Sequence, residues 1–97
     1  MYNIQFSKNA LMDLEYFRKF DHKIILAGIE QNLSHQPSSK TKNRKPLRPN
    51  ELAKWELRIE QNRVFYDVLE VEQIVDVVAI GWKEHNKLFI RGEEVKL

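Results

Sequence analysis

Five cations and no acid lie between residues 36 and 50: Lys40, Lys42, Arg44, Lys45 and Arg48. Exposed lysines and arginines without neighbouring acids attract a phosphate backbone, and such binding weakens as the salt concentration rises. The rest of the chain carries 11 basic and 14 acidic side chains, so the body of the protein is mildly acidic. This distribution favours a polyanion bound at one place, and the alternative is a solvated flexible loop.

Arg63 is the second candidate for phosphate binding, because it follows the predicted hairpin turn Gln61-Asn62 directly. A guanidinium donates bidentate hydrogen bonds to phosphate, and a rigid pair of strands would hold it in place. The alternative is a structural ion pair with Glu60 or Asp67.

Arg58 lies before the same turn and shares a predicted strand face with Lys54, Glu56 and Glu60. A row of mixed charge on one strand face is typical of a solvated sheet surface. We therefore expect at most a peripheral phosphate contact from Arg58.

Lys83, His85 and Lys87 cluster after the last predicted core strand. Histidine exchanges protons near neutral pH, so His85 is a candidate general acid or base, although a surface histidine is more often a bystander. The sequence has no cysteine, no His-Glu-x-x-His pattern and only three glycines, which predicts chemistry without a metal or cofactor.

The first elements follow from hydrophobic spacing. Residues 2–6 alternate like a strand, Ser7 is a favourable helix N-cap, and apolar residues then recur at helical spacing to Phe20. Asp21 is the predicted cap of a second helix with Ile25, Ile29 and Leu33 on one stripe. The short break predicts an antiparallel helix hairpin, followed by a loop over residues 36–50 that three prolines keep irregular.

The second half of the chain predicts strands. Residues 55–59 alternate, residues 64–69 follow the turn, and residues 73–80 form a nearly continuous apolar run after a turn at residues 70–72. Gly81 is expected to end that run, and residues 88–90 are a possible short fifth strand. The order predicts an α+β fold in a single domain, residues 1–97, with one sheet face partly open for a site. No apolar run approaches the roughly 18 residues of a membrane span.

The segments Leu57-Arg58, residues 63–68 and Ala79-Ile80-Gly81 resemble the toxins of RelE/ParE-type bacterial toxin–antitoxin modules. The resemblance extends over the chain in element order. It implies a β-α-α-β-β-β arrangement, with a twisted, mainly antiparallel sheet packed on the helix hairpin. It also implies a small cytoplasmic toxin that a cognate antitoxin neutralises in a hetero-oligomer.

The ribonuclease branch of this family cleaves messenger RNA in the ribosomal decoding site, using basic residues and no metal. By resemblance, Arg63, Lys54 and Lys83 fall on basic positions of that site, and His85 is the expected proton carrier. Glu56 and Phe89 depart from the pattern, because some members have a lysine and a catalytic tyrosine there. A ParE-like inhibitor of DNA gyrase, or a degenerate member that only binds antitoxin or RNA, are the alternatives.

Overall fold

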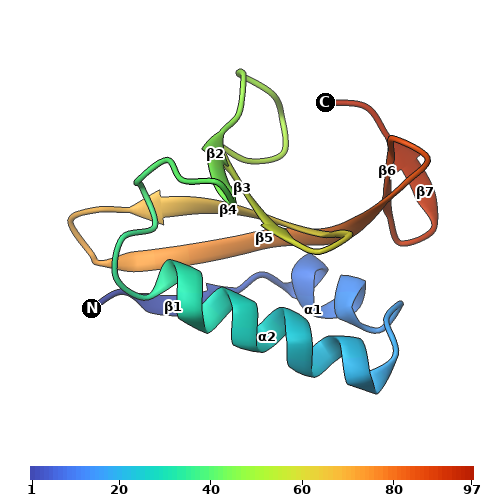
Figure 1. Ribbon diagram of the computed structural model, residues 1–97. Coiled ribbons are helices and arrows are strands. Elements are labelled where there is room, and N and C mark those ends of the chain that lie inside the picture. The colour runs from blue at the N-terminus through green and yellow to red at the C-terminus, as the bar shows by residue number, and fades with distance from the viewer.

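The computed structural model describes residues 1–97 and forms two layers, a seven-stranded sheet and a pair of helices on one of its faces (Figure 1). The elements in chain order are β1 (Asn3–Phe6), α1 (Lys8–Leu14), α2 (Lys19–Leu33), β2 (Arg44–Pro46), β3 (Trp55–Ile59), β4 (Asn62–Leu69), β5 (Ile74–Glu84), β6 (Lys87–Ile90) and β7 (Glu93–Val95). The predicted α+β class is confirmed.

The sheet has the order β2-β3-β4-β5-β6-β7 with antiparallel neighbours throughout, and β1 pairs in parallel with the first half of β5. The three-stranded meander predicted from the sequence corresponds to β3, β4 and β5, and the predicted short strand at residues 88–90 corresponds to β6. Strands β2 and β7 were not expected. Strand β2 lies inside the stretch predicted as an irregular loop, where it pairs with β3 despite the neighbouring prolines.

The main core lies between the helices and the sheet. One stripe of α2 supplies Ile25, Ile29 and Leu33, which are almost fully buried against the inward residues of β3, β4 and β5. Trp55 stacks on Tyr66 within this layer, with ring centroids 6.1 Å apart. This packing fixes the hairpin β3–β4 relative to the helices, so the polar side chains of the opposite face have a rigid support.

A second, smaller cluster covers part of the other sheet face. Its buried members are Ala53, Phe65, Ala79, Leu88 and Ile90. The β6–β7 hairpin rises from one end of the sheet on the side opposite the helices, and the connection between β2 and β3 arches over the same side (Figure 1). The face expected to be open is therefore bounded by two walls.

The helix boundaries differ from the prediction. Ser7 caps α1 as expected, because its Oγ accepts a hydrogen bond from the Ala10 amide. However, α1 ends at Leu14 instead of Phe20, and the chain turns so that Phe17 packs edge-on against Trp82. Arg18 is the N-cap of α2 and Asp21 lies in its first turn, where a carboxylate still favours the helix dipole.

The strand boundaries also differ in two places. The turn between β3 and β4 is Glu60-Gln61 rather than Gln61-Asn62, and Glu60 takes the positive φ of 57°. Gly81 lies inside β5 and does not end it. A Cβ at this position would come within 2.3 Å of the Phe89 carbonyl oxygen, so the glycine permits β6 to cross close to β5.

Helix α1 covers a gap in the sheet between β1 and β6. Strand β5 bulges where Phe65 pairs with Ala79 but the next residue of β4 pairs with Val77. In this stretch the Ser7 hydroxyl donates to the Val78 carbonyl, and the Asp13 carboxylate accepts the amide of Ile80. The side chains of the α1 segment thus replace a missing strand partner.

Candidate nucleic-acid interface

A groove of about 520 Å³ lies on the sheet face opposite the helices. Its walls are the segment from β2 into the β2–β3 connection and the β6–β7 hairpin, and Glu56 of β3 lies between them. The charged residues that line it are five cations and two carboxylates: Lys45, Arg48, Lys83, Lys87, Lys96, Glu56 and Glu94. A concave surface with this excess of cations favours a polyanion.

The cations predicted from the basic stretch take different places. Lys45 and Arg48 line the groove, whereas Lys40 and Lys42 are exposed outside it. Arg44 faces the other way, and its guanidinium donates to the carbonyls of Ser39 and Asn32 at 3.0 Å and 2.5 Å. Arg44 therefore anchors this segment to the end of α2, and Lys45, the next residue of β2, projects to the groove side.

Lys83 reaches the groove from the end of β5, next to Leu88 of the paired strand β6. Two further cations line the groove: Lys87, which the sequence analysis placed in a cluster with Lys83 and His85 without a role, and Lys96, which it did not single out. Their signal was the alternation of the C-terminal segment, which places them on a hairpin that folds back over the sheet.

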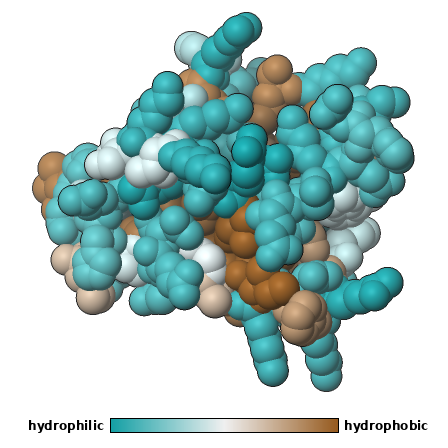
Figure 2. All heavy atoms as spheres, viewed as in Figure 1, coloured by the Kyte–Doolittle hydropathy of each residue, from teal (hydrophilic) through white to brown (hydrophobic).

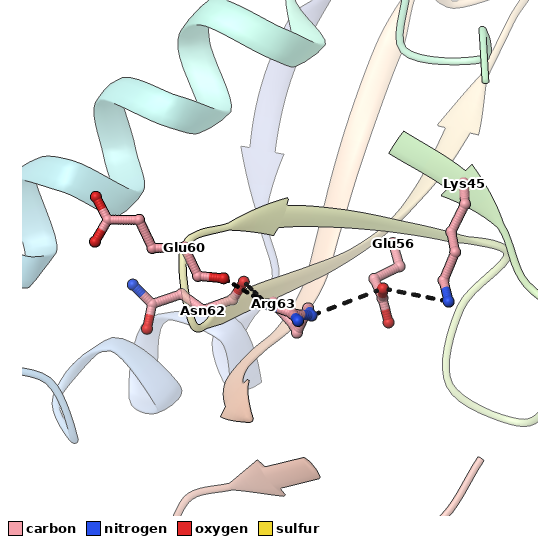
Figure 3. Close-up of polar contacts among 5 residues, drawn as sticks. All are labelled: Lys45, Glu56, Glu60, Asn62 and Arg63. Carbon is pink, nitrogen blue, oxygen red and sulfur yellow. Dashed lines mark hydrogen bonds and ion pairs between the residues drawn. The ribbon is translucent and has the colours of Figure 1, made fainter. Parts of the chain in front are cut away.

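Arg63 does not line the groove. Its side chain is only 9% exposed, and its Nη1 donates to the carbonyls of Glu60 and Asn62 at 2.8 Å and 3.0 Å (Figure 3). Its Nε lies 3.9 Å from Glu56 Oε2, without a hydrogen bond. Burial lowers the pKa of Arg63, and the carboxylate of Glu56 opposes this effect.

Glu56 connects Arg63 to the groove, because the same carboxylate lies 3.8 Å from Lys45 Nζ (Figure 3). Only 10% of its side chain is exposed, so the expected solvated row of mixed charge is wrong at this position. The two walls over the sheet face explain the difference, since they remove Glu56 from water while Arg58 stays exposed at the hairpin tip.

Arg58 and Lys54 lie near the groove without lining it. Arg58 pairs with Arg63 across the hairpin, and its positive charge contributes to the lowered pKa of Arg63. Lys54 is exposed at the start of β3, where its amide donates to Asp67 Oδ1 at 2.8 Å.

His85 belongs to a different cavity. It forms the β5–β6 turn with Asn86, and both residues have positive φ, 53° and 65°. His85 lines a cavity of about 770 Å³ together with Phe17 and Trp82 on the helix side of the sheet, whereas Asn86 lines the basic groove and Lys83 lines both cavities. Phe89 stacks on Trp82, with ring centroids 6.0 Å apart. Neither His85 nor Phe89 lines the basic groove, although their neighbours Asn86 and Leu88 do.

Exposed apolar side chains concentrate on the helix layer. They include Leu11, Met12, Tyr16, Phe20 and Leu26, with exposed fractions between 41% and 72%. Figure 2 shows the largest hydrophobic patch of this view in its lower central part, while hydrophilic residues cover most of the surface above the sheet. Neither helix combines the length and apolar character that crossing a membrane requires.

Two solved complexes contain a chain with the same architecture. The toxin–antitoxin complex RelBE2 from Mycobacterium tuberculosis matches with a TM-score of 0.69 and 19% identity, over 84% of this chain and 98% of that chain. The archaeal RelE–RelB complex from Pyrococcus horikoshii matches with a TM-score of 0.68 and 16% identity, over 87% of this chain and 97% of that chain. No family model and no curated protein matches the sequence. The chain therefore has a RelE-like fold.

Proposed function

We propose that this protein is the toxin of a toxin–antitoxin module and that it inhibits translation by cleaving messenger RNA on the ribosome. The observation that carries the proposal is the basic groove on the open sheet face of a RelE-like fold. The helices occupy the other face, so the groove is free for a nucleic-acid strand.

The groove would hold the RNA backbone by electrostatic contacts. Its five cations exceed its two carboxylates by three charges. Each phosphate contact to a single strand contributes about −0.7 to the slope of log affinity against log salt, so five contacts give a slope of about −3.5. Binding of this type fixes the position of the strand and carries little information about its sequence.

In the proposed cleavage, the RNA supplies both the nucleophile and the leaving group. The ribose 2′-hydroxyl attacks the adjacent phosphate, the P–O bond to the 5′ oxygen of the next nucleotide breaks, and a 2′,3′-cyclic phosphate forms. Lys45 and Lys83 would stabilise the negative charge that develops on the phosphoryl oxygens. Glu56 lines the groove beside Lys45, so it is better placed than His85 to accept the 2′-hydroxyl proton, and the leaving 5′ oxygen would take a proton from water.

Arg63 has a supporting role in this proposal. Its hydrogen bonds tie the hairpin turn, and its charge holds Glu56 beside Lys45. Lys54, Arg58, Lys40 and Lys42 would contribute long-range attraction from outside the groove.

Expression in a bacterial host tests the toxin proposal. The unmodified chain should arrest growth and truncate messages at codon positions, while Lys45→Ala/Lys83→Ala should relieve both effects. Lys23→Ala is a matched control, because this exposed lysine lies on α2, behind the sheet. Normal growth and intact messages at verified expression of the folded chain would contradict the proposal.

A second candidate function is inhibition without cleavage, either of DNA gyrase or by binding RNA alone. The separation of His85 and Phe89 from the groove favours it, since a phenyl ring carries no exchangeable proton. Loss of supercoiling by purified gyrase, with ribosome-bound message intact, would support the gyrase alternative. A ribosome-dependent cleavage product would exclude both non-cleaving alternatives.

We also propose a cognate antitoxin as the partner in a hetero-oligomer. The two similar structures are complexes of this kind, and the exposed apolar residues of the helix layer would suit an amphipathic segment. The gene beside this one should encode a small chain that co-purifies with it and restores growth. A protein that stays monomeric when co-expressed with each adjacent gene product would contradict this partner.

A further inference from the structure

The β6–β7 hairpin is one wall of the groove, and only strand β6 of the hairpin pairs with the rest of the sheet. Strand β6 shares three residue pairs with β5, Phe89 stacks on Trp82, and Leu88 and Ile90 belong to the small apolar cluster. The hairpin supplies Lys87 and Lys96 to the groove. The distance between these cations and those of the opposite wall therefore depends on what fixes the hairpin.

One ion pair joins the hairpin to the helix layer. Asp13 of α1 is 1% exposed, and its Oδ1 lies 3.0 Å from Nε of Arg91 in the β6–β7 turn. Its Oδ2 accepts the amide of Ile80 at 2.9 Å. The carboxylate thus contacts the central strand and the turn at once, through the gap in the sheet.

The residue type at the turn supports a role for this contact. Arg91 and Gly92 have φ values of 51° and 78°, the pattern of a two-residue turn that favours asparagine and glycine. An arginine is costly at the first position, because its Cβ crowds the backbone there. The Arg91 guanidinium, however, forms an ion pair with the buried Asp13. Asparagine is shorter and uncharged, so it could not form this ion pair.

We propose that Asp13 and Arg91 are positioning residues that hold the β6–β7 hairpin as a wall of the groove and so set its affinity for a phosphate chain. Neither residue lines the groove itself. The proposal rests on the proposed function, in that the groove must bind RNA for the affinity to be measured.

The test uses a variant pair that removes the ion pair without leaving a buried charge. Asp13→Asn keeps an acceptor for the Ile80 amide, and Arg91→Gly relieves the positive φ, so the double variant should stay folded. Fluorescence anisotropy with a labelled oligouridylate measures binding at several salt concentrations. Arg18→Gly is the matched control, because it removes an arginine at an exposed N-cap position, where glycine is tolerated, on the helix side.

We expect the double variant to bind about ten-fold more weakly at low salt, with a salt slope shallower by about 1.4, the equivalent of two lost phosphate contacts. Arg18→Gly should bind oligouridylate like the unmodified protein. Arg91→Lys as a single substitution, with Asp13 present, should keep most of the affinity of the unmodified protein. Hydrogen exchange should become faster at the β6–β7 amides while the amides of β3 and β4 stay protected. Adding Lys87→Ala to the double variant should then reduce affinity less than it does in the unmodified chain.

The outcomes separate the two proposals. Unchanged exchange at β6–β7 would overturn the positioning role whether or not RNA binds. Faster exchange with unchanged RNA affinity would also overturn it. Faster exchange in a protein whose unmodified form never binds oligouridylate would refute the groove and leave the ion pair as a purely structural attachment. If the double variant fails to fold, Asp13→Asn/Arg91→Asn gives the same comparison, because asparagine is favoured at the first position of this turn.

Discussion

The Arg63→Ala variant should be less stable than the unmodified protein, because the Arg63 side chain is buried and hydrogen-bonded to the hairpin turn. Arg63→Ala removes two hydrogen bonds from a charged donor to the carbonyls of Glu60 and Asn62. Hydrogen bonds that involve a charged group contribute about 1.5–3 kcal/mol each, and because Glu60 is exposed at the turn we take about 1 kcal/mol apiece. The variant also leaves Glu56 nearly buried with only Lys45 as partner.

Losing one partner of a fully buried ion pair costs about 3–5 kcal/mol. The Arg63–Glu56 contact is looser, at 3.9 Å without a hydrogen bond, and Lys45 still compensates the charge, so about 1 kcal/mol is a reasonable share. The sum is about 3 kcal/mol, which corresponds to a decrease in Tm of about 12–24 °C for a domain of this size. Urea unfolding and thermal melts at neutral pH measure both quantities.

Two comparisons make this reasoning refutable. Arg58→Ala removes an exposed arginine on the cross-strand position, and it should change the unfolding free energy by less than about 0.5 kcal/mol. The double variant Arg63→Ala/Glu56→Gln should be about 1 kcal/mol more stable than Arg63→Ala, because the nearly buried carboxylate that lost Arg63 is then replaced by a neutral amide. If Arg63→Ala and Arg58→Ala have the same Tm within experimental error, Arg63 is not the structural residue that its contacts indicate. A loss of toxicity in Arg63→Ala is informative only at temperatures where the variant is folded.

Three further perturbations have defined outcomes. Gly81→Ala should destabilise the protein by about 3 kcal/mol in urea titrations, because its Cβ would collide with the Phe89 carbonyl; wild-type stability would show that β6 adapts. Tyr66→Phe should cost about 1–3 kcal/mol, since the buried hydroxyl donates to the Pro37 carbonyl at 2.7 Å, and unchanged stability would mean that another donor replaces it. Burial raises the pKa of Asp13, so its contribution is fully present below the unfolded value near 4 and is lost as pH rises through the folded value. The stability of the unmodified chain relative to Asp13→Asn should therefore fall as the pH rises above about 4, and a difference independent of pH would contradict the raised pKa.

The elements that the sequence predicted best are those whose signals are local. Ser7 as a cap and the stripe of Ile25, Ile29 and Leu33 depend on neighbours within a few turns, and the structure has both. The meander followed from strand alternation. The end of α1 was missed because it depends on the contact of Phe17 with Trp82, a residue far away in the sequence.

The site was harder to predict because its shape arises from two segments that fold over the sheet. Alternation alone places Glu56 on the solvated side of β3, and nothing in its neighbours indicates that a remote hairpin will cover it. His85 next to Asn86 was interpreted as part of a reactive cluster, whereas the pair forms a turn with positive φ. Two cations of the basic stretch, Lys45 and Arg48, line the groove, whereas Arg44 shows that charge alone does not reveal which way a side chain points.

Because β1 pairs in parallel with β5, the sheet cannot be completed until most of the chain has been synthesised. Asn3 lies opposite Ile74, so the first strand waits for a partner that is made about seventy residues later. At elongation rates of about 5–20 residues per second, this interval lasts several seconds. During that time α1 and α2 lack the strands that bury them, and their apolar stripes are available to whatever protein is being made nearby. A nascent chain of this topology therefore exposes the apolar faces of its helix layer before its sheet can be completed.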